Sequence, residues 1–348
     1  MLPDNDMPPR KNLKPIVLSC AGEALTADEK SLFSDYPPAG LIVFRRNCVS
    51  KAQLVDLIAS FRDIIGWADA PVLIDQEGGS VARLTAPEWT EFPAAGEFAA
   101  LAENDLERAC DAAYKNALAM GAEMAEAGIT VNCAPVMDVP APECHDFLSG
   151  SRTYGKTPHQ VTVMAEHVCR GLLAAGITPV MKHIPGHGRG TVDSHLELPR
   201  VAAGLEDLRR SDFAPFRVLA GSDLGHAVWA MGAHVVYDAM DAERPATVSE
   251  IVTEKIIRGE IGFTGVLIAD DIGMKALSGT VTERALATLA AGNDLTLHCS
   301  GDFDEMRGIL SALPDIVPLA LERMLRAEQQ RRDCHAGADV PERGILKG

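Results

Sequence analysis

The feature that most constrains how this chain can fold is the repeated alternation of short apolar segments with longer amphipathic ones. The short segments are rich in branched aliphatic residues and end in glycine, proline or charged residues, which is typical of buried strands. The longer segments carry apolar residues every three or four positions, which indicates helices. Strands are predicted at residues 16–20, 40–44, 71–74, 129–134, 178–181, 227–231, 266–268 and 295–298, and helices at 28–35, 51–65, 105–127, 158–175, 205–220, 249–260, 282–291 and beyond 301.

This alternation predicts an α/β fold with parallel strands and right-handed crossovers. Eight such units over about 300 residues fit a (β/α)8 barrel of the TIM type better than an open doubly wound sheet, which remains the alternative. No low-complexity segment divides the chain, so we expect a single domain. The predicted boundaries are a polar N-terminal extension at 1–14, the barrel at 15–335 and a polar C-terminal tail at 336–348.

The composition narrows the range of partners and locations. A net charge of −17 and an isoelectric point of about 5.0 argue against binding to nucleic acid or to an anionic membrane surface. No apolar segment of the secretory type follows residues 1–14, and no apolar run reaches the roughly 18 residues of a membrane span. The eight cysteines include no CxxC pair. We therefore expect a cytoplasmic, reduced protein without disulfide bonds.

Charged side chains follow the predicted strands at the point where each strand ends. In a parallel barrel these points share one rim, where barrel enzymes place their reacting groups. A charged residue after a strand can also be a simple cap for the next helix, but the shared position favours a site. The residues concerned are Asp75, Glu77, Asp138, Lys182, His183, His234, Asp270 and Asp271.

The densest of these groups is the segment 182–195, KHIPGHGRGTVDSH, for which two interpretations remain open. One is a metal site built on His183, His187, Asp193 and His195. The four-residue spacing of the first two histidines suits a helix, which the proline and glycines between and after them oppose. A nucleotide-binding loop is not indicated, because the glycine spacing fits neither the dinucleotide pattern nor the P-loop.

The other interpretation is an acid/base site in which Asp193 orients His195 and fixes its tautomer. Asp270 or Asp271, at the end of the seventh strand, would then supply a carboxylate. One carboxylate and one proton donor on either side of a bond is the arrangement of glycoside hydrolysis, although carboxylates usually fill both roles. Of the two aspartates, Asp271 is the one expected to be structural.

Five motifs occur in the order in which they are found in family 3 glycoside hydrolases, and the chain resembles the bacterial β-N-acetylhexosaminidase branch of that family. The resemblance extends from about residue 16 to residue 300, and the longest motif is the most specific. It implies a one-domain catalytic barrel without cofactor or metal. The motifs are DQEGG at 75–79, SRTYG at 151–155, KHIPGHG with DSH at 182–195, AHVVY at 233–237 and ADD at 269–271.

The resemblance also implies residue roles. Asp270 would be the nucleophile that forms a covalent glycosyl-enzyme, and His195, held by Asp193, would be the general acid and then the base. The sugar in the −1 subsite, which carries the bond to be cleaved, would be bound by Asp75, Arg83, Arg152, Lys182 and His183.

The implied substrate is a small sugar, N-acetylglucosamine linked to 1,6-anhydro-N-acetylmuramic acid with or without peptide, cleaved by a monomeric cytoplasmic enzyme of cell-wall recycling. The alternatives are a β-N-acetylglucosaminide phosphorylase, a family 3 β-glycosidase of broader specificity, and a non-enzymatic sugar-binding protein. We further expect His187 to form a hydrogen bond that folds its loop, and His234 either to be a core residue or to line the site. The glycine-rich loop that carries His195 is expected to move.

Overall fold

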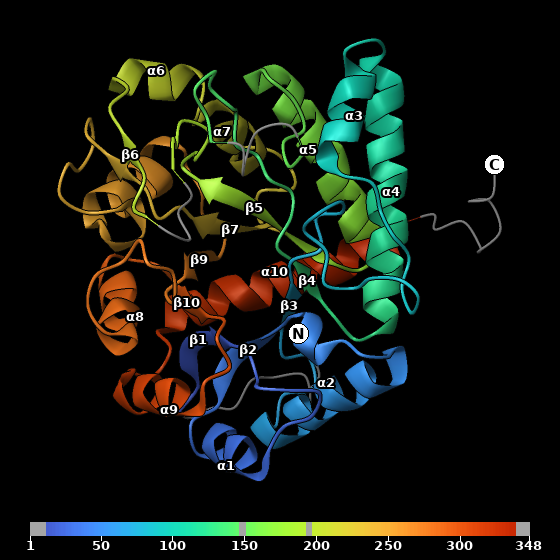
Figure 1. Cartoon of the computed structure of the whole chain (residues 1–348), viewed down its shortest axis with the longest axis vertical. Helices are drawn as coiled ribbons and strands as arrows, with labels where there is room; N and C mark the ends of the chain where they lie inside the picture. The colour runs from blue at the N-terminus through green and yellow to red at the C-terminus, as the bar shows by residue number, and fades with distance from the viewer. Residues whose placement is uncertain (1–11, 146–150, 193–196, 339–348) are drawn as a thin grey trace.

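The computed structural model of the chain describes residues 12–145, 151–192 and 197–338, and it forms a closed parallel barrel. The strands follow one another around the barrel in the order β1-β10-β9-β7-β5-β4-β3-β2 (Figure 1). The predicted barrel is confirmed and the open sheet is wrong. The barrel strands are β1 (Lys14–Leu18), β2 (Pro38–Val43), β3 (Val72–Ile74), β4 (Val131–Asn132), β5 (Thr178–Ile184), β7 (Trp229–Gly232), β9 (Leu267–Asp271) and β10 (Leu295–His298).

Helices surround this barrel, and their first turns are fixed by side chains that the sequence places at the N-caps. Ser50, Asp105 and Thr157 each accept a hydrogen bond from a backbone N–H three residues further on. The longer helices are α1 (Ala27–Asp35), α2 (Lys51–Ile65), α3 (Ala95–Ala102), α4 (Leu106–Glu126), α5 (Pro158–Ala174), α8 (Val281–Ala290), α9 (Phe303–Ala312), α10 (Pro318–Ala336) and the π-helix η4 (Ile251–Glu260).

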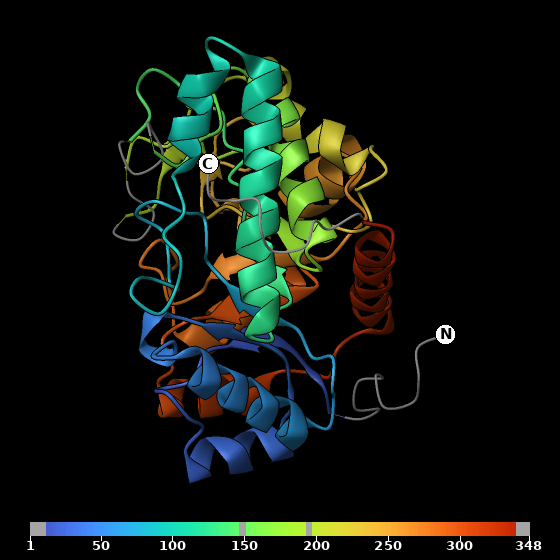
Figure 2. The ribbon, with the colours of Figure 1, turned by 90° about the vertical axis from the view of Figure 1, so that its right-hand side faces the viewer.

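The helices α4 and α5 pack closely and lie side by side along one flank of the barrel (Figure 2). Their contact depends on small residues, because a Cβ on Gly171 would lie 2.4 Å from the backbone oxygen of Tyr114. A Cβ on Gly121 would lie 2.5 Å from the Cβ of Ala175. Larger residues at these two positions would therefore force the helices apart.

Several predicted elements differ from the structure. The predicted helix 205–220 is two helices, α6 (Leu205–Arg210) and α7 (Ala214–Ala220), because Pro215 belongs to a first turn rather than to a helix interior. The helix α3 was not predicted: it lies at Ala95–Ala102, between the predicted strand 71–74 and the predicted helix 105–127. A small parallel sheet of β6 (Arg200–Val201) and β8 (Val236–Tyr237) was not predicted.

The two ends of the described barrel are attached to it by specific contacts and by a long helix. β1 begins at Lys14, whose side chain is buried and whose Nζ donates to the Leu313 carbonyl at 3.0 Å and to Asp315 at 2.8 Å. At the other end α10 continues to Ala336. All eight cysteines are free thiols. Within the described ranges no helix is both long and apolar enough to cross a bilayer.

Candidate active site

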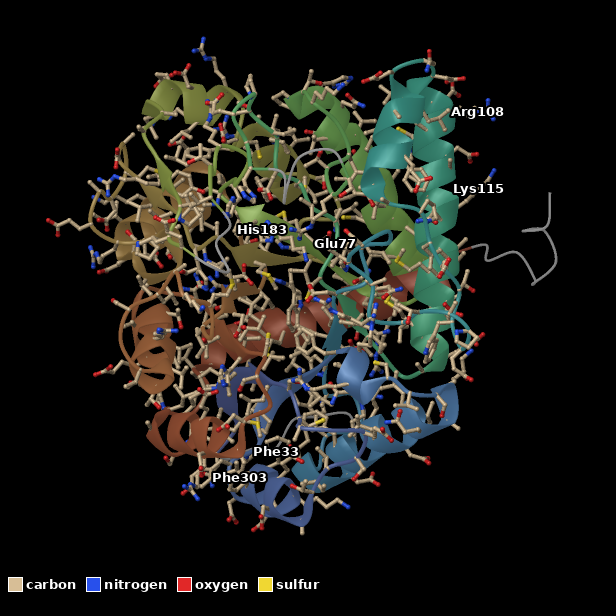
Figure 3. All side chains as sticks on the ribbon, in the orientation of Figure 1. Phe33, Glu77, Arg108, Lys115, His183 and Phe303 are labelled. Carbon is tan, nitrogen blue, oxygen red and sulfur yellow. The ribbon has the colours of Figure 1, made fainter. Side chains whose placement is uncertain are left out.

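The charged residues predicted to share a rim do lie at the carboxyl ends of the barrel strands. Figure 3 shows Glu77 and His183 near the centre of the molecule, beside the end of β5. Two strands run further than predicted: β5 includes Lys182 and His183, and β9 includes Asp270. These side chains are therefore fixed by strand backbone rather than by loops.

Three of these residues, Asp75, Glu77 and Lys182, form with Arg152 a cluster of alternating charge, named here the charge cluster. Lys182 Nζ lies 2.7 Å from Glu77 Oε1 and 3.1 Å from Asp75 Oδ1. Arg152 donates twice to Glu77, from Nε at 2.8 Å and from Nη2 at 2.7 Å. The planar guanidinium therefore faces the carboxylate with both of its oxygens engaged.

The charge cluster determines the protonation of its members. Burial disfavours the charged form of Glu77, but Lys182 and Arg152 outweigh it and lower the pKa of the carboxyl to about 2. Burial likewise opposes ionisation of Asp75, and Lys182 with Arg83 still lowers its pKa. The pKa of Lys182 is raised, because Glu77 and Asp75 overcome the effect of its burial. All four groups are thus charged at neutral pH.

The turn that carries Glu77 needs glycine. Gly78 and Gly79 have φ angles of 93° and 58°, which side chains rarely adopt. A Cβ on Gly78 would also lie 2.2 Å from the Pro93 carbonyl oxygen. The two glycines of the DQEGG motif are therefore what allows Glu77 to turn back toward Lys182.

Arg83 joins the charge cluster from a loop. Its Nη2 lies 3.2 Å from Asp75 Oδ2, and its backbone N–H donates to Gln76 Oε1 at 2.8 Å. The Phe44 ring lies 5.2 Å from this guanidinium and 5.0 Å from that of Arg46. Of the five predicted sugar-binding residues, Arg83 and Lys182 therefore contact Asp75 directly, and Arg152 joins them through Glu77.

The fifth, His183, is oriented by a different carboxylate. Its Nδ1 lies 2.7 Å from Asp138 Oδ2, and its backbone N–H donates to Oδ1 at 3.2 Å. Asp138 is fully buried and also accepts the N–H of His187 at 2.6 Å. Burial would raise the pKa of Asp138, but His183 lowers it. This arrangement leaves Nε2 of His183 for a ligand.

Asp270 differs from the other carboxylates of the rim. It is half-buried, and from the described residues its Oδ1 accepts only the N–H of the next residue, at 2.8 Å. Within the described part of the chain it forms no ion pair. Burial opposes its ionisation, while His234 and His183 lower its pKa. Asp270 is therefore an ionised carboxylate whose Oδ2 accepts no hydrogen bond from the described residues, and such a group can act as a nucleophile.

The neighbours of Asp270 have structural roles. Asp271 accepts the N–H groups of Gly273 at 2.9 Å and Cys299 at 3.1 Å, so it is the structural carboxylate that was predicted. His234 is fully buried, with Nδ1 2.7 Å from Thr247 Oγ1 and Nε2 3.0 Å from the Asp271 carbonyl. Of its two predicted alternatives, the core residue is therefore the one observed, although its ring still acts electrostatically on Asp270.

Asp193 and His195 lie outside the described residues, so their roles and the expected motion of their loop remain predictions. Residues 186–189, which precede them in the chain, are held in place by hydrogen bonds. Arg189 Nε donates to Asp212 at 2.8 Å, and the Tyr237 hydroxyl donates to the Gly186 carbonyl at 2.8 Å. The break between α6 and α7, missed from the sequence, is what places Asp212 under this segment.

His187 forms the loop-folding hydrogen bond that was predicted, but through its backbone. Both nitrogens of its buried ring have no hydrogen-bond partner among the described residues. Burial lowers the pKa of the ring to about 4. Within the same residues no three His, Cys, Asp or Glu side chains come together in a way that could hold a metal ion.

Two residues of the site were recognised as rim charges in the sequence but not assigned to it. Glu77 is the central acceptor of the charge cluster, and Asp138 orients His183. Glu77 is part of the DQEGG motif, which could have pointed to it. Asp138 had only its place after a strand as a signal, because its partner is 45 residues away.

Comparison of the sequence with known proteins identifies a family and several relatives. Residues 12–330 match the N-terminal domain of glycosyl hydrolase family 3. The chain is 35% identical over 319 residues to a beta-hexosaminidase of Alkalilimnicola ehrlichii, covering 90% of this chain and 88% of that protein. It is 36% identical over 290 residues to a beta-hexosaminidase of Xylella fastidiosa, covering 82% and 83% respectively.

The fold of the chain is also similar to solved structures. NagZ from Neisseria gonorrhoeae, in complex with N-trifluoroacetyl-D-glucosamine, has a TM-score of 0.82 and 29% identity, over 93% of this chain and 97% of that one. A family 3 β-N-acetylglucosaminidase from Paenibacillus sp. FPU-7 has a TM-score of 0.78 and 32% identity over 94% of this chain. This chain spans 63% of that longer enzyme.

The barrel and the charged groups at its rim define the class of protein, a glycoside hydrolase. The chain belongs to glycosyl hydrolase family 3. The resemblance predicted from the five motifs is confirmed, and an enzyme is supported over a non-enzymatic sugar-binding protein.

Proposed function

We propose that this enzyme is a retaining exo-β-N-acetylglucosaminidase that removes terminal N-acetylglucosamine from 1,6-anhydromuropeptides during peptidoglycan recycling. The observation that carries the proposal is the state of Asp270, which is an ionised carboxylate without an ion pair among the described residues, on the same barrel rim as the paired charges. The names of the relatives, beta-hexosaminidase and β-N-acetylglucosaminidase, support the sugar.

In the proposed reaction Asp270 attacks the anomeric carbon, and the bond to the leaving oxygen breaks as that oxygen takes a proton from His195. Water then attacks the glycosyl ester while His195 accepts a proton, and Asp270 is released as the carboxylate. Asp193 holds the imidazole in the required tautomer.

Binding of the sugar in the −1 subsite is assigned to Asp75, Arg83, Arg152, Lys182 and His183. Asp75 is half-buried at the edge of the charge cluster and has oxygens able to accept from sugar hydroxyls. Glu77 and Asp138 hold the cations and His183 in place rather than contacting the sugar. We expect a monomeric cytoplasmic enzyme that needs no metal or cofactor.

A mechanism-based label tests this proposal. The enzyme is incubated with a 5-fluoro β-N-acetylglucosaminyl fluoride, digested, and the peptides are analysed by mass spectrometry. A glycosyl adduct on Asp270 is the expected result. An unlabelled protein that is strongly inhibited by a thiazoline would instead indicate participation of the 2-acetamido group, and the proposed nucleophile would be wrong.

Two further measurements separate the remaining alternatives. Turnover in phosphate buffer that yields a sugar 1-phosphate would identify a phosphorylase, whereas free N-acetylglucosamine is the product expected here. Comparable kcat/KM values for aryl β-glucosides and aryl β-N-acetylglucosaminides would indicate the β-glycosidase of broader specificity.

A further inference from the structure

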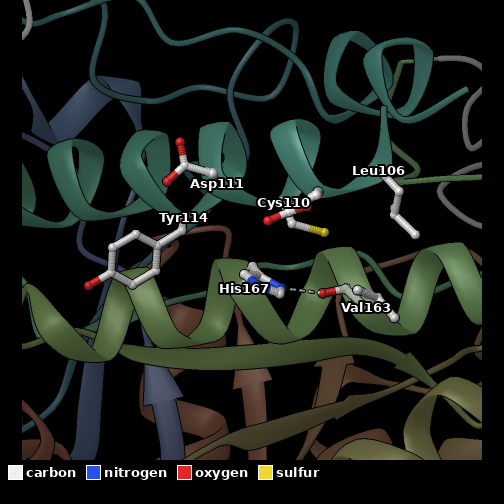
Figure 4. A pocket seen from close by; sticks show the side chains of 7 residues that line it. Leu106, Cys110, Asp111, Tyr114, Val163 and His167 are labelled. Carbon is white, nitrogen blue, oxygen red and sulfur yellow. Dashed lines mark hydrogen bonds between the residues drawn. The ribbon is translucent and has the colours of Figure 1, made fainter. Parts of the chain in front are cut away.

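A groove on the outer flank of the barrel, far from the proposed reaction, lies between α4 and α5. Its volume is about 620 Å³. Figure 4 shows Leu106, Cys110 and Tyr114 of α4 facing Val163 and His167 of α5. His167 Nδ1 lies 2.8 Å from the Val163 carbonyl oxygen, which fixes the ring along the groove. The surface between the helices is therefore mostly apolar.

The described chain comes back to this groove at its C-terminal end. The last helix, α10, is attached to the end of α5, with His335 Nδ1 2.7 Å from the Ala174 carbonyl oxygen. Beyond it, Ala338 packs against a small cluster of Leu118, Ala174 and Ala175, and Tyr114 packs against the same cluster. Tyr114 also lines the groove, so the described chain ends at one end of the groove.

The segment that follows has the length and the composition to fill it. From Tyr114 to Leu106 the groove follows eight residues of helix, about 12 Å at 1.5 Å per residue. Residues 339–348, DVPERGILKG, can extend up to about 33 Å. Their apolar residues are Val340, Ile345 and Leu346, enough to cover the aliphatic part of the groove.

The charges of the segment are balanced, with Asp339 and Glu342 against Arg343 and Lys347, but the two basic residues are the ones that flank Ile345 and Leu346. The groove is edged by Glu107 and Asp111. Asp111 is paired with Lys115 at 2.7 Å, and Glu107 has no ion pair among the described residues, so it can attract a basic residue of the segment. Attachment through α10 keeps the segment near the groove at high effective concentration, so weak contacts suffice.

We propose that residues 339–348 bind in the groove between α4 and α5 of the same molecule, with Ile345 and Leu346 against Leu106 and Val163. The groove lies on the side of the α4–α5 pair away from the close contact that is made by small residues. This binding is independent of the proposed reaction.

Amide hydrogen exchange of the full-length protein tests the proposal. The amides of residues 342–347 are expected to exchange about 10-fold more slowly than in an unstructured peptide, the protection given by about 90% occupancy. Exchange at the unstructured rate overturns the proposal. Protection that disappears on dilution also overturns it, because the segment would then occupy the groove of a second copy.

Two variants show which surface gives the protection. Val163→Glu places a charge in the groove and is expected to abolish it, whereas Leu286→Glu, an exposed leucine on α8, is the matched control and leaves it intact. In case Val163→Glu disturbs α5, the variant Ile345→Asp/Leu346→Asp changes only the segment. It is expected to shift the methyl NMR signals of Val163 and not those of Leu286, and unchanged Val163 signals overturn the proposal.

Discussion

Two parts of the barrel rim differ in whether their charged groups are paired: the charge cluster and Asp270. In the charge cluster each carboxylate of Asp75 and Glu77 is matched by Lys182 or an arginine, and the groups hold one another in fixed positions. Among the described residues Asp270 accepts only a backbone N–H from its neighbour, and its ionised form is favoured by two histidines, His234 and His183. Paired charges make a rigid surface for binding, whereas an ionised group without a partner is available to react.

The largest loss of activity is expected from substitution of Asp270. Asp270→Ala removes the proposed nucleophile and should lower kcat for an aryl β-N-acetylglucosaminide on the order of 10⁴-fold or more. Thermal stability should change little, because no described side chain depends on Asp270. Steady-state kinetics beside a melting curve measure both, and near-normal turnover would exclude the assigned role.

In the charge cluster, a substitution is expected to affect the stability of the fold most. Glu77→Ala leaves Lys182 and Arg152 buried without their shared carboxylate, which should reduce the free energy of unfolding by about 3–5 kcal/mol. Urea denaturation measures this change. The matched control is Asp304→Ala, which breaks the exposed pair with Arg307 and should have no measurable effect. Equal effects of the two variants would mean that the charge cluster is not a structural unit.

A smaller effect on catalysis is expected from substitution of Asp138, the carboxylate that orients His183. Asp138→Asn weakens a charge-assisted hydrogen bond worth about 1.5–3 kcal/mol, so kcat/KM should fall about 10- to 100-fold. Fluoroglycoside labelling of Asp270 should still occur. The control Asp241→Asn changes a buried carboxylate that binds Ser249 outside the site, and it should leave kcat/KM unchanged.

Some elements of the fold could be predicted from the sequence and others could not. The barrel was predictable because each strand is a local apolar run, as at residues 295–298, where the predicted and observed strands coincide. The helix 205–220 was predicted without its break, although Pro215 was visible, because the apolar periodicity continues across it. The π-helical hydrogen bonding of η4 leaves no distinct periodicity in ten residues.

For the site, the motifs gave the residue types but not their pairing. Lys182 meets Asp75 across 107 positions of the chain, and Arg152 meets Glu77 across 75. Such contacts are set by the closure of the barrel, which brings the ends of β3 and β5 together around β4. The sequence therefore predicted that these residues bind a ligand, whereas the structure shows that most of them first bind each other.

The smallest effect at neutral pH is expected at His187, whose buried ring has no hydrogen-bond partner among the described residues. Burial lowers its pKa from 6.5 to about 4, so the folded state favours the neutral ring. The stability that this provides is complete above pH 6.5 and is lost as the pH falls toward 4, because the unfolded chain takes up the proton first.

His187→Leu should change the free energy of unfolding at pH 7 by less than about 1.5 kcal/mol and should reduce the decline of that free energy between pH 6.5 and 4. Urea denaturation at a series of pH values measures this slope, with His226→Leu, an exposed histidine, as the control that leaves it unchanged. An unaltered slope in His187→Leu would mean that the ring is protonated in the folded protein, and so has an acidic partner as the charge cluster does.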